Sequence, residues 1–143
     1  MANAKEFSLE DIDAIILKDD AEKLVQVSRI LGEDLARSRL ATHQLRNLFG
    51  EVRRIAMDLE LELARQGEQK RISPTLRRRI LLLKPRMAYQ AARIQTRETA
   101  MERLKQVLER AIDHIGDNPD RFQRFVDFFE AIVAYHRYYL KES

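Results

Sequence analysis

The sequence predicts an all-α protein, folded as a compact bundle of five to six helices in a single domain over residues 1–143. Apolar residues recur at steps of three and four along most of the chain, which is the period of an amphipathic helix. The chain has only four glycines and three prolines, too few for a turn-rich β-sheet protein, and no segment alternates as a strand would. With 143 residues, of which 45% are apolar, it can bury one sizeable core.

Three helices are expected in the N-terminal half. Ser8, followed three residues later by Asp11, is typical of a capping box that begins a short helix ending near Leu17. An aspartate of the pair at 19–20 can cap the next helix, which continues to about Arg37. A longer helix begins at Thr42 and ends at 66–67. Its apolar stripe consists of Leu45, Leu48, Val52, Ile55, Leu59 and Leu63.

Residues 67–73 are polar and contain a glycine, so we expect a loop there, and a hinge if two chains exchange helices. Ser73-Pro74 begins the next helix, because serine caps the first turn and proline fits its first position. Pro85 must either kink or divide this helix, because proline lacks a backbone donor and clashes with the preceding turn.

The last two helices are expected at about 97–115 and 119–140. The turn sequence Gly116-Asp117-Asn118-Pro119 separates them. The first of the two has an inward stripe of Met101, Leu104, Leu108, Ala111 and Ile115. The second is the most hydrophobic helix, with a stripe of Phe122, Phe125, Phe129, Ile132, Val133, His136 and Leu140.

The composition argues against several classes of protein. The chain has no cysteine, which removes disulfides, thiolate metal sites and cysteine nucleophiles. Its first residues do not show the basic segment and apolar run of a signal peptide. No apolar run approaches the length of a membrane span. We therefore expect a soluble, cytoplasmic protein that does not contact a membrane.

Catalytic and metal-binding patterns are also missing. His43, His114 and His136 fall on three different predicted helices, and none belongs to a closely spaced ligand pair. His136 shares a stripe with large apolar residues and is expected to be a buried structural histidine, whereas His114 is expected at the surface near a helix end. No serine stands in a nucleophile motif, and no glycine-rich phosphate loop occurs. We expect no enzyme activity, no metal and no cofactor.

Positive charge is concentrated in the middle of the chain. Residues 37–97 carry 15 Lys or Arg against 5 Asp or Glu, including the triplet Arg77-Arg78-Arg79. The flanking segments 1–36 and 98–143 have net charges of −5 and −2, so the net charge of +3 hides a strongly polarised molecule. All but two of the central cations are arginines, which bind phosphate oxygens with two parallel donors. A nucleic acid is the expected partner.

The central arginines form two rows at helical spacing. Arg46 and Arg53 are seven residues apart and lie on one face of the third helix, and Gly50 between them leaves room for a nucleic-acid backbone. Arg86 and Arg93 are also seven apart, with Arg97 four residues further on. Such rows suit a track of phosphates. The alternative is a merely solvated surface, whose ion pairs contribute little and say nothing of function.

Three sequence blocks, taken together, resemble a known family. They are Ala41–Phe49 (ATHQLRNLF), Leu82–Tyr89 (LLKPRMAY) and Phe129–Tyr139 (FEAIVAYHRYY). The chain is similar to the small helical subunit of the type III-A CRISPR effector, the Csm complex. The most specific part of the resemblance is the Lys-Pro-Arg-x-Ala-Tyr block combined with the distant Ala-Tyr-His run.

The resemblance implies a non-catalytic subunit that lines the interior of a ribonucleoprotein filament. Such subunits associate with one another along the filament, touch the backbone of the guide RNA paired with its target RNA, and bridge the repeated backbone subunit to the large subunit. Carried over by matching position, the RNA-contacting residues are Arg46, Lys84, Arg86 and Arg93. Arg53 and Arg39 are added from the charge geometry alone. Phosphate contacts would accept any guide sequence and would weaken with salt.

Other interpretations stay open on the residues alone. The equivalent small subunit of type III-B complexes is close in role. A helix-turn-helix DNA-binding regulator would need a tightly turned helix pair and a preference for defined duplex DNA. A small helical enzyme of the chorismate mutase kind would use several arginines to hold a dicarboxylate. A helical scaffold protein without RNA contact would tolerate reversal of the arginine charges.

Overall fold

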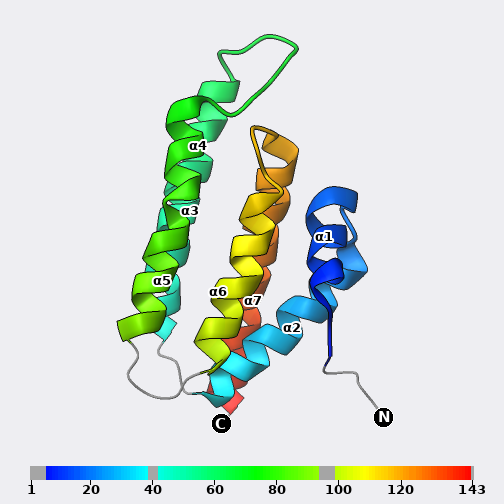
Figure 1. Cartoon of the computed structure of the whole chain (residues 1–143), viewed down its shortest axis with the longest axis vertical. Coiled ribbons are helices and arrows are strands. Elements are labelled where there is room, and N and C mark those ends of the chain that lie inside the picture. The colour runs from blue at the N-terminus through cyan, green and yellow to red at the C-terminus, as the bar shows by residue number, and fades with distance from the viewer. Residues whose placement is uncertain (1–5, 39–41, 94–98, 143) are drawn as a thin grey trace.

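The computed structural model describes residues 6–38, 42–93 and 99–142, and within these ranges the chain is helical without any strand (Figure 1). The expected all-α bundle is confirmed. The helices are α1 (Leu9–Lys18), α2 (Ala21–Arg37), α3 (Thr42–Leu63), α4 (Pro74–Leu81), α5 (Leu83–Arg93), α6 (Thr99–Asp113) and α7 (Pro119–Glu142). None of the helices that the structure describes is long and apolar enough to cross a membrane.

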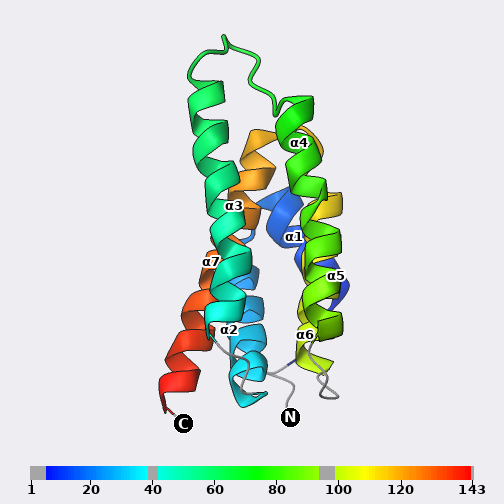
Figure 2. The same ribbon diagram turned by 90° about the vertical axis from the view of Figure 1, so that its left-hand side faces the viewer.

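Helices α3 and α4–α5 form one long hairpin, which packs beside the remaining helices (Figures 1 and 2). Helices α4 and α5 follow one another along the same line, antiparallel to α3. On the other side α2 packs against α7, while α1 contacts α2, α6 and α7. The hairpin is joined to this group through contacts of α3 with α7 and of α5 with α6. The arginine-rich segment therefore occupies one side of the bundle.

The expected apolar stripes supply the core. On α3 the buried side chains are Leu45, Leu48, Val52, Ile55 and Leu59. On α7 the expected stripe is buried at Phe122, Phe125, Phe129, Ile132 and His136, and Phe128 is buried as well. The rings of Phe49 and Phe129 lie 5.2 Å apart and join α3 to α7. Because one continuous cluster of buried residues includes all seven helices, the arginine-bearing hairpin is held on a packed support.

Helix α2 crosses α7 at Gly32, which the sequence pattern alone did not explain. A Cβ atom at this position would lie 2.6 Å from Cβ of Tyr135 and 2.7 Å from the backbone nitrogen of His136. No real side chain is accommodated at such distances. Gly32 therefore allows the two helix backbones to touch, which offsets the cost of a glycine within a helix.

Three helices begin where the sequence predicts. The Ser8 backbone N–H donates to a carboxylate oxygen of Asp11 at 3.0 Å, at the start of α1. The Lys23 N–H donates to Asp20 at 3.1 Å, and the Leu76 N–H donates to the Ser73 hydroxyl at 3.2 Å. These side chains satisfy backbone donors that have no partner in the first helical turn.

The segment around Pro85 is divided rather than kinked, and the break falls at Leu82. Pro85 is thereby placed third in α5, where a missing backbone donor costs no helical hydrogen bond. The turn is bridged by the Leu82 N–H, which donates to the Arg78 carbonyl at 3.0 Å, and by the Arg86 N–H, which donates to the Leu82 carbonyl at 3.4 Å. The two helices consequently stay aligned.

The connection between α3 and α4 is longer than expected, because α3 ends at Leu63 and not near residue 66. The side-chain amide of Gln66 exchanges two hydrogen bonds with the backbone of Arg71, and Ile72 N–H donates to the Asp117 carbonyl at 2.9 Å. The Ser73 N–H donates to Glu62 at 3.0 Å. Glu62 therefore holds the start of α4.

Candidate nucleic-acid interface

The predicted site residues that the structure describes lie on the hairpin of α3 and α4–α5. Arg46 and Arg53 are exposed on α3, and Arg86 is exposed on α5. Neither Arg46 nor Arg53 has a carboxylate partner among the described residues. Arg93 lies at the end of α5, but the structure does not describe its side chain. Arg39 lies outside the described residues altogether.

Arg53 is supported by an aromatic ring from the same helix. Its guanidinium carbon lies 5.9 Å from the centroid of Phe49, within the range of a cation–π interaction. Phe49 itself is buried against α7. The guanidinium therefore stands at the edge of the groove between α3 and α7, which Met57 and Glu60 also line. An exposed arginine whose aliphatic stem packs on the protein in this way can still bind a phosphate with its guanidinium.

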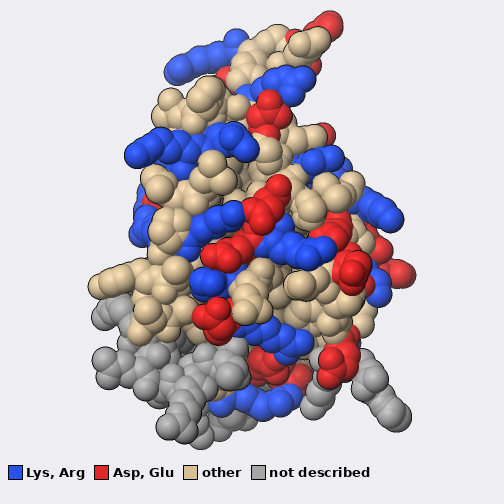
Figure 3. Space-filling view, viewed as in Figure 1, with Lys and Arg blue, Asp and Glu red and all other residues tan. Residues whose placement is uncertain are grey.

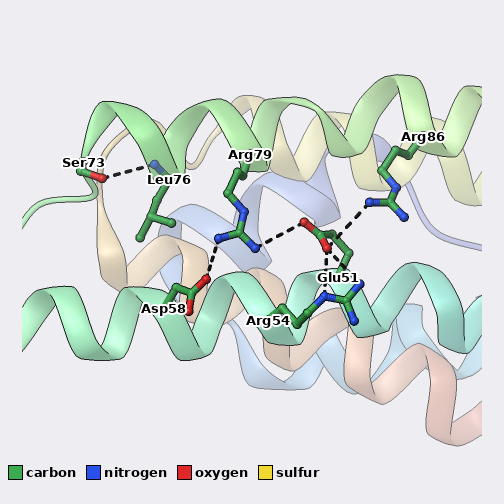
Figure 4. A network of polar contacts seen from close by, with 7 residues as sticks. All are labelled: Glu51, Arg54, Asp58, Ser73, Leu76, Arg79 and Arg86. Atoms are coloured by element: carbon green, nitrogen blue, oxygen red, sulfur yellow. Dashed lines mark hydrogen bonds and ion pairs between the residues drawn. The ribbon is translucent and has the colours of Figure 1, made fainter.

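A second group of arginines surrounds Glu51 (Figure 4). Arg54, from the next turn of α3, donates to the Glu51 carboxylate at 3.0 and 3.2 Å. Arg79 of α4 lies 3.5 Å from the same carboxylate and donates to Asp58 at 2.6 Å. Arg86 of α5 lies 3.8 Å from Glu51. The hydrogen bond to Asp58, followed by the attraction of Glu51, raises the pKa of Arg79.

Arg86 and Lys84 lie on different sides of α5. Lys84 pairs with Asp113 of α6, whereas Arg86 faces Glu51 of α3. The separation follows from helix geometry, because residues two apart point about 200° away from each other. The structure thus brings Arg86 towards Glu51 and Arg54 of α3 but leaves Lys84 against α6. Arg53, two residues after Glu51, points to the α7 side of α3 instead.

Two further cations, Arg77 and Arg78, were not among the predicted site residues, although their position in a basic triplet was a visible signal. Both line a groove of about 870 Å³ between α4 and the connection that precedes it, with Leu81, Leu82 and Pro74 as apolar lining. Neither has a carboxylate partner in the part of the chain that the structure describes. Basic side chains accordingly gather over α4 and this connection in the upper left of Figure 3.

The charges of α1 and α6 form a separate clamp. Asp13 accepts two hydrogen bonds from Arg110, at 2.7 and 2.8 Å, and lies 2.6 Å from Nε2 of His114. The hydrogen bond from Arg110 is the largest cause that lowers the pKa of Asp13 from 3.8 to about 2, with a further contribution from His114 and an opposing one from burial. His114 is therefore a half-buried partner of α1 and not only a surface residue.

No metal centre is formed by the described residues. No three of their His, Asp or Glu side chains come together in a way that could hold an ion. The acidic groups nearest to the arginines, Glu51 and Asp58, are occupied by ion pairs. What the hairpin offers chemically is a set of guanidinium donors on a rigid helical support.

The fold and this surface define a class: a small all-α protein whose arginines line one helical hairpin. Comparison with known proteins identifies the family, because the profile of Csm2, type III-A, matches residues 18–142. The chain is also 28% identical, over 123 residues, to the "CRISPR system Cms protein Csm2" of Mycobacterium tuberculosis strains CDC 1551 and H37Rv. That match covers 86% of this chain and 94% of the relative.

The chain belongs to the Csm2 type III-A family. The resemblance seen in the three sequence blocks is thereby confirmed. Membership makes the chain a small subunit of a type III-A CRISPR complex, in which it is assembled with other Csm subunits.

Proposed function

We propose that this subunit binds the backbone of the guide and target RNA through the outer face of the α3 and α4–α5 hairpin, without reading sequence and without catalysing a reaction. The observation that carries the proposal is the exposure of Arg46 and Arg53 on one face of α3 without carboxylate partners among the described residues. Unpaired guanidiniums at helical spacing suit phosphates, which every RNA sequence presents alike.

Arg86 adds an exposed guanidinium on α5, beside Glu51 and Arg54. Its side chain is 52% exposed although it approaches Glu51. Gly50 supports a close approach by RNA, because the nearest atom to a Cβ placed there is Nη1 of Arg54, at 3.9 Å. We assign the central contacts to Arg46, Arg53 and Arg86, and flanking contacts to Lys84, Arg93 and Arg39.

The remaining partners belong to the same proposal. We place the subunit in the cytoplasm, along the interior of a filament in which copies of the chain associate with one another. The repeated backbone subunit and the large subunit are its protein neighbours. Catalysis in such an assembly would be carried out by other subunits.

The test starts with the tagged protein, purified from a host shown to express a Csm complex. The particle mass and RNA content of the wild type are compared with those of Arg46→Glu/Arg53→Glu. Arg29→Glu is the control, because Arg29 is exposed on α2 outside the basic segment. We expect the wild type and control to be recovered in large particles with short RNA that cross-links to the chain under ultraviolet light, and the double variant to lose that cross-link.

The competing functions predict other results. Intact particles in which the reversed arginines still cross-link normally would remove the arginine face from the proposal and favour a scaffold without RNA contact. A small species without RNA, binding a defined duplex DNA, would favour a DNA-binding regulator.

A further inference from the structure

We propose that Glu51 is a positioning residue, which holds Arg54 and Arg86 in the geometry that binds an RNA phosphate. The inference rests on the proposed function. It explains why a carboxylate is present in a cationic surface, where a negative charge would otherwise not be expected. Glu51 is the only acidic residue between Asp34 and Asp58, within the basic segment of residues 37–97.

The geometry places one carboxylate beneath three guanidiniums that come from three helices. Oε1 of Glu51 accepts from Nε and Nη2 of Arg54 and lies 3.8 Å from Nη1 of Arg86. Oε2 lies 3.5 Å from Nη2 of Arg79. Because Arg54 and Arg86 approach the same oxygen, their guanidiniums stand close enough to donate to one phosphate or to two neighbouring phosphates (Figure 4).

Burial separates the carboxylate from the arginines that it holds. The Glu51 side chain is only 16% exposed, whereas Arg54 is 62% exposed and Arg86 is 52% exposed. Arg79 is 31% exposed and is also fixed by Asp58, so its part is to hold α4 against α3. Glu51 therefore lies below the surface, while Arg54 and Arg86 turn their remaining donors outwards.

Two physical effects make such a carboxylate useful to a phosphate site. Neighbouring guanidiniums repel one another, and a carboxylate between them removes that repulsion. An unrestrained arginine must also lose side-chain freedom when it binds, and this loss of conformational entropy opposes binding. Glu51 has already ordered the two side chains across the α3–α5 seam, so less side-chain entropy is lost when RNA binds.

The opposing effect makes the inference falsifiable. Glu51 carries a negative charge that repels RNA, so a purely electrostatic account predicts that Glu51→Gln tightens binding and steepens its salt dependence. Positioning predicts the reverse. The sign of the change therefore decides between the two accounts.

The experiment measures the affinity of the full chain for a short RNA duplex by fluorescence anisotropy, between about 50 and 200 mM salt. For Glu51→Gln we expect binding about three- to tenfold weaker, with a salt slope shallower by about one phosphate contact. Glu51→Asp should behave in the same way, since it keeps the charge but loses reach. Glu60→Gln is the matched control: the same charge change on an exposed residue of the same helix. Its affinity should stay constant or rise slightly.

A second comparison, made in a variant that lacks both positioned arginines, distinguishes a positioning role of Glu51 from a general effect on stability. In Arg54→Gln/Arg86→Gln, the further change Glu51→Gln should leave RNA affinity unchanged or slightly higher, because only its repulsive charge is then removed. If it still weakens binding there, Glu51 acts through general stability and the inference is overturned. Unchanged or tighter binding by Glu51→Gln alone also overturns it, while leaving the proposed function intact. A wild-type chain that shows no salt-dependent RNA binding counts against both.

Discussion

Two helix contacts in this molecule depend on different physics. At the crossing of α2 and α7, Gly32 brings two backbones into direct contact, over a core of fully buried phenylalanines. In the seam between α3 and α4–α5 the inner side is apolar, but the outer side is joined by Glu51, Asp58 and the arginines around them. The first contact depends on shape and the second on charge, so they should respond to different perturbations.

The largest expected effect is at the crossing. Gly32→Ala places a Cβ atom 2.6 to 2.9 Å from atoms of Tyr135 and His136, so the helices must separate. Overpacking of this kind costs about 1–3 kcal/mol or more, and the better helix propensity of alanine returns about 1. We expect the free energy of unfolding to fall by about 2 kcal/mol, measured by urea denaturation.

Gly50→Ala is the control for that change. It makes the same substitution within a helix, but the nearest atom to the new Cβ lies 3.9 Å away. The variant should gain about 0.5–1 kcal/mol in stability. If both glycine variants were equally stable, close packing at the crossing would not be the reason for Gly32.

A smaller effect is expected in acid, at the charged clamp between α1 and α6. The folded-state pKa of Asp13, held near 2 by the Arg110 guanidinium and His114, is below its ordinary value of 3.8. Asp13 therefore contributes stability that is present above about pH 4 and is lost as the pH falls towards 2. Asp13→Asn should melt at a lower temperature than the wild type at pH 7.

The pH profile is the control for this prediction. The difference in melting temperature between Asp13→Asn and the wild type should shrink between pH 4 and pH 2. A difference that stays constant over that range would mean that ionisation of Asp13 does not stabilise the fold. The loss caused by Gly32→Ala, in contrast, should not depend on this titration.

The smallest expected effect is in the α3–α4 seam. Arg79→Gln removes the ion pairs with Asp58 and Glu51 but leaves the apolar contacts beneath them. Because the arginine is partly exposed, we expect a loss of about 0.5–1 kcal/mol at low salt. Thermal unfolding in about 1 M salt should reduce that loss, because the charges are then screened.

Salt dependence is what distinguishes the two contacts. The Gly32→Ala loss should persist in high salt, since steric overlap is not screened. An Arg79→Gln loss that stayed the same in high salt would indicate that the seam is held by packing, and the comparison between the two contacts would fail.

Local features of this fold were predictable from the sequence, whereas contacts between distant helices were not. The caps at Ser8, Asp20 and Ser73 and the stripe of α3 depend on residues a few positions apart, and the structure confirms them. Gly32 could be read only as a weakness in a helix pattern, because its reason lies more than 100 residues away, at Tyr135.

The candidate site shows the same division. Spacing alone placed Arg46 and Arg53 on one face of α3, and helix geometry could also have separated Lys84 from Arg86. The grouping of arginines around Glu51 could not be predicted, because it needs the register of α4–α5 against α3. The groove beside Arg77 and Arg78 depends in turn on how residues 64–73 fold back.

The Gly32 crossing also limits how this sequence can vary. Of the three atoms that a side chain at position 32 would meet, two belong to the backbone of α7. No replacement of Tyr135 by a smaller residue can therefore compensate for a larger residue at 32. A suppressor mutation would have to move a whole helix. Glycine is therefore the one amino acid that natural sequence variation or protein engineering can place at position 32.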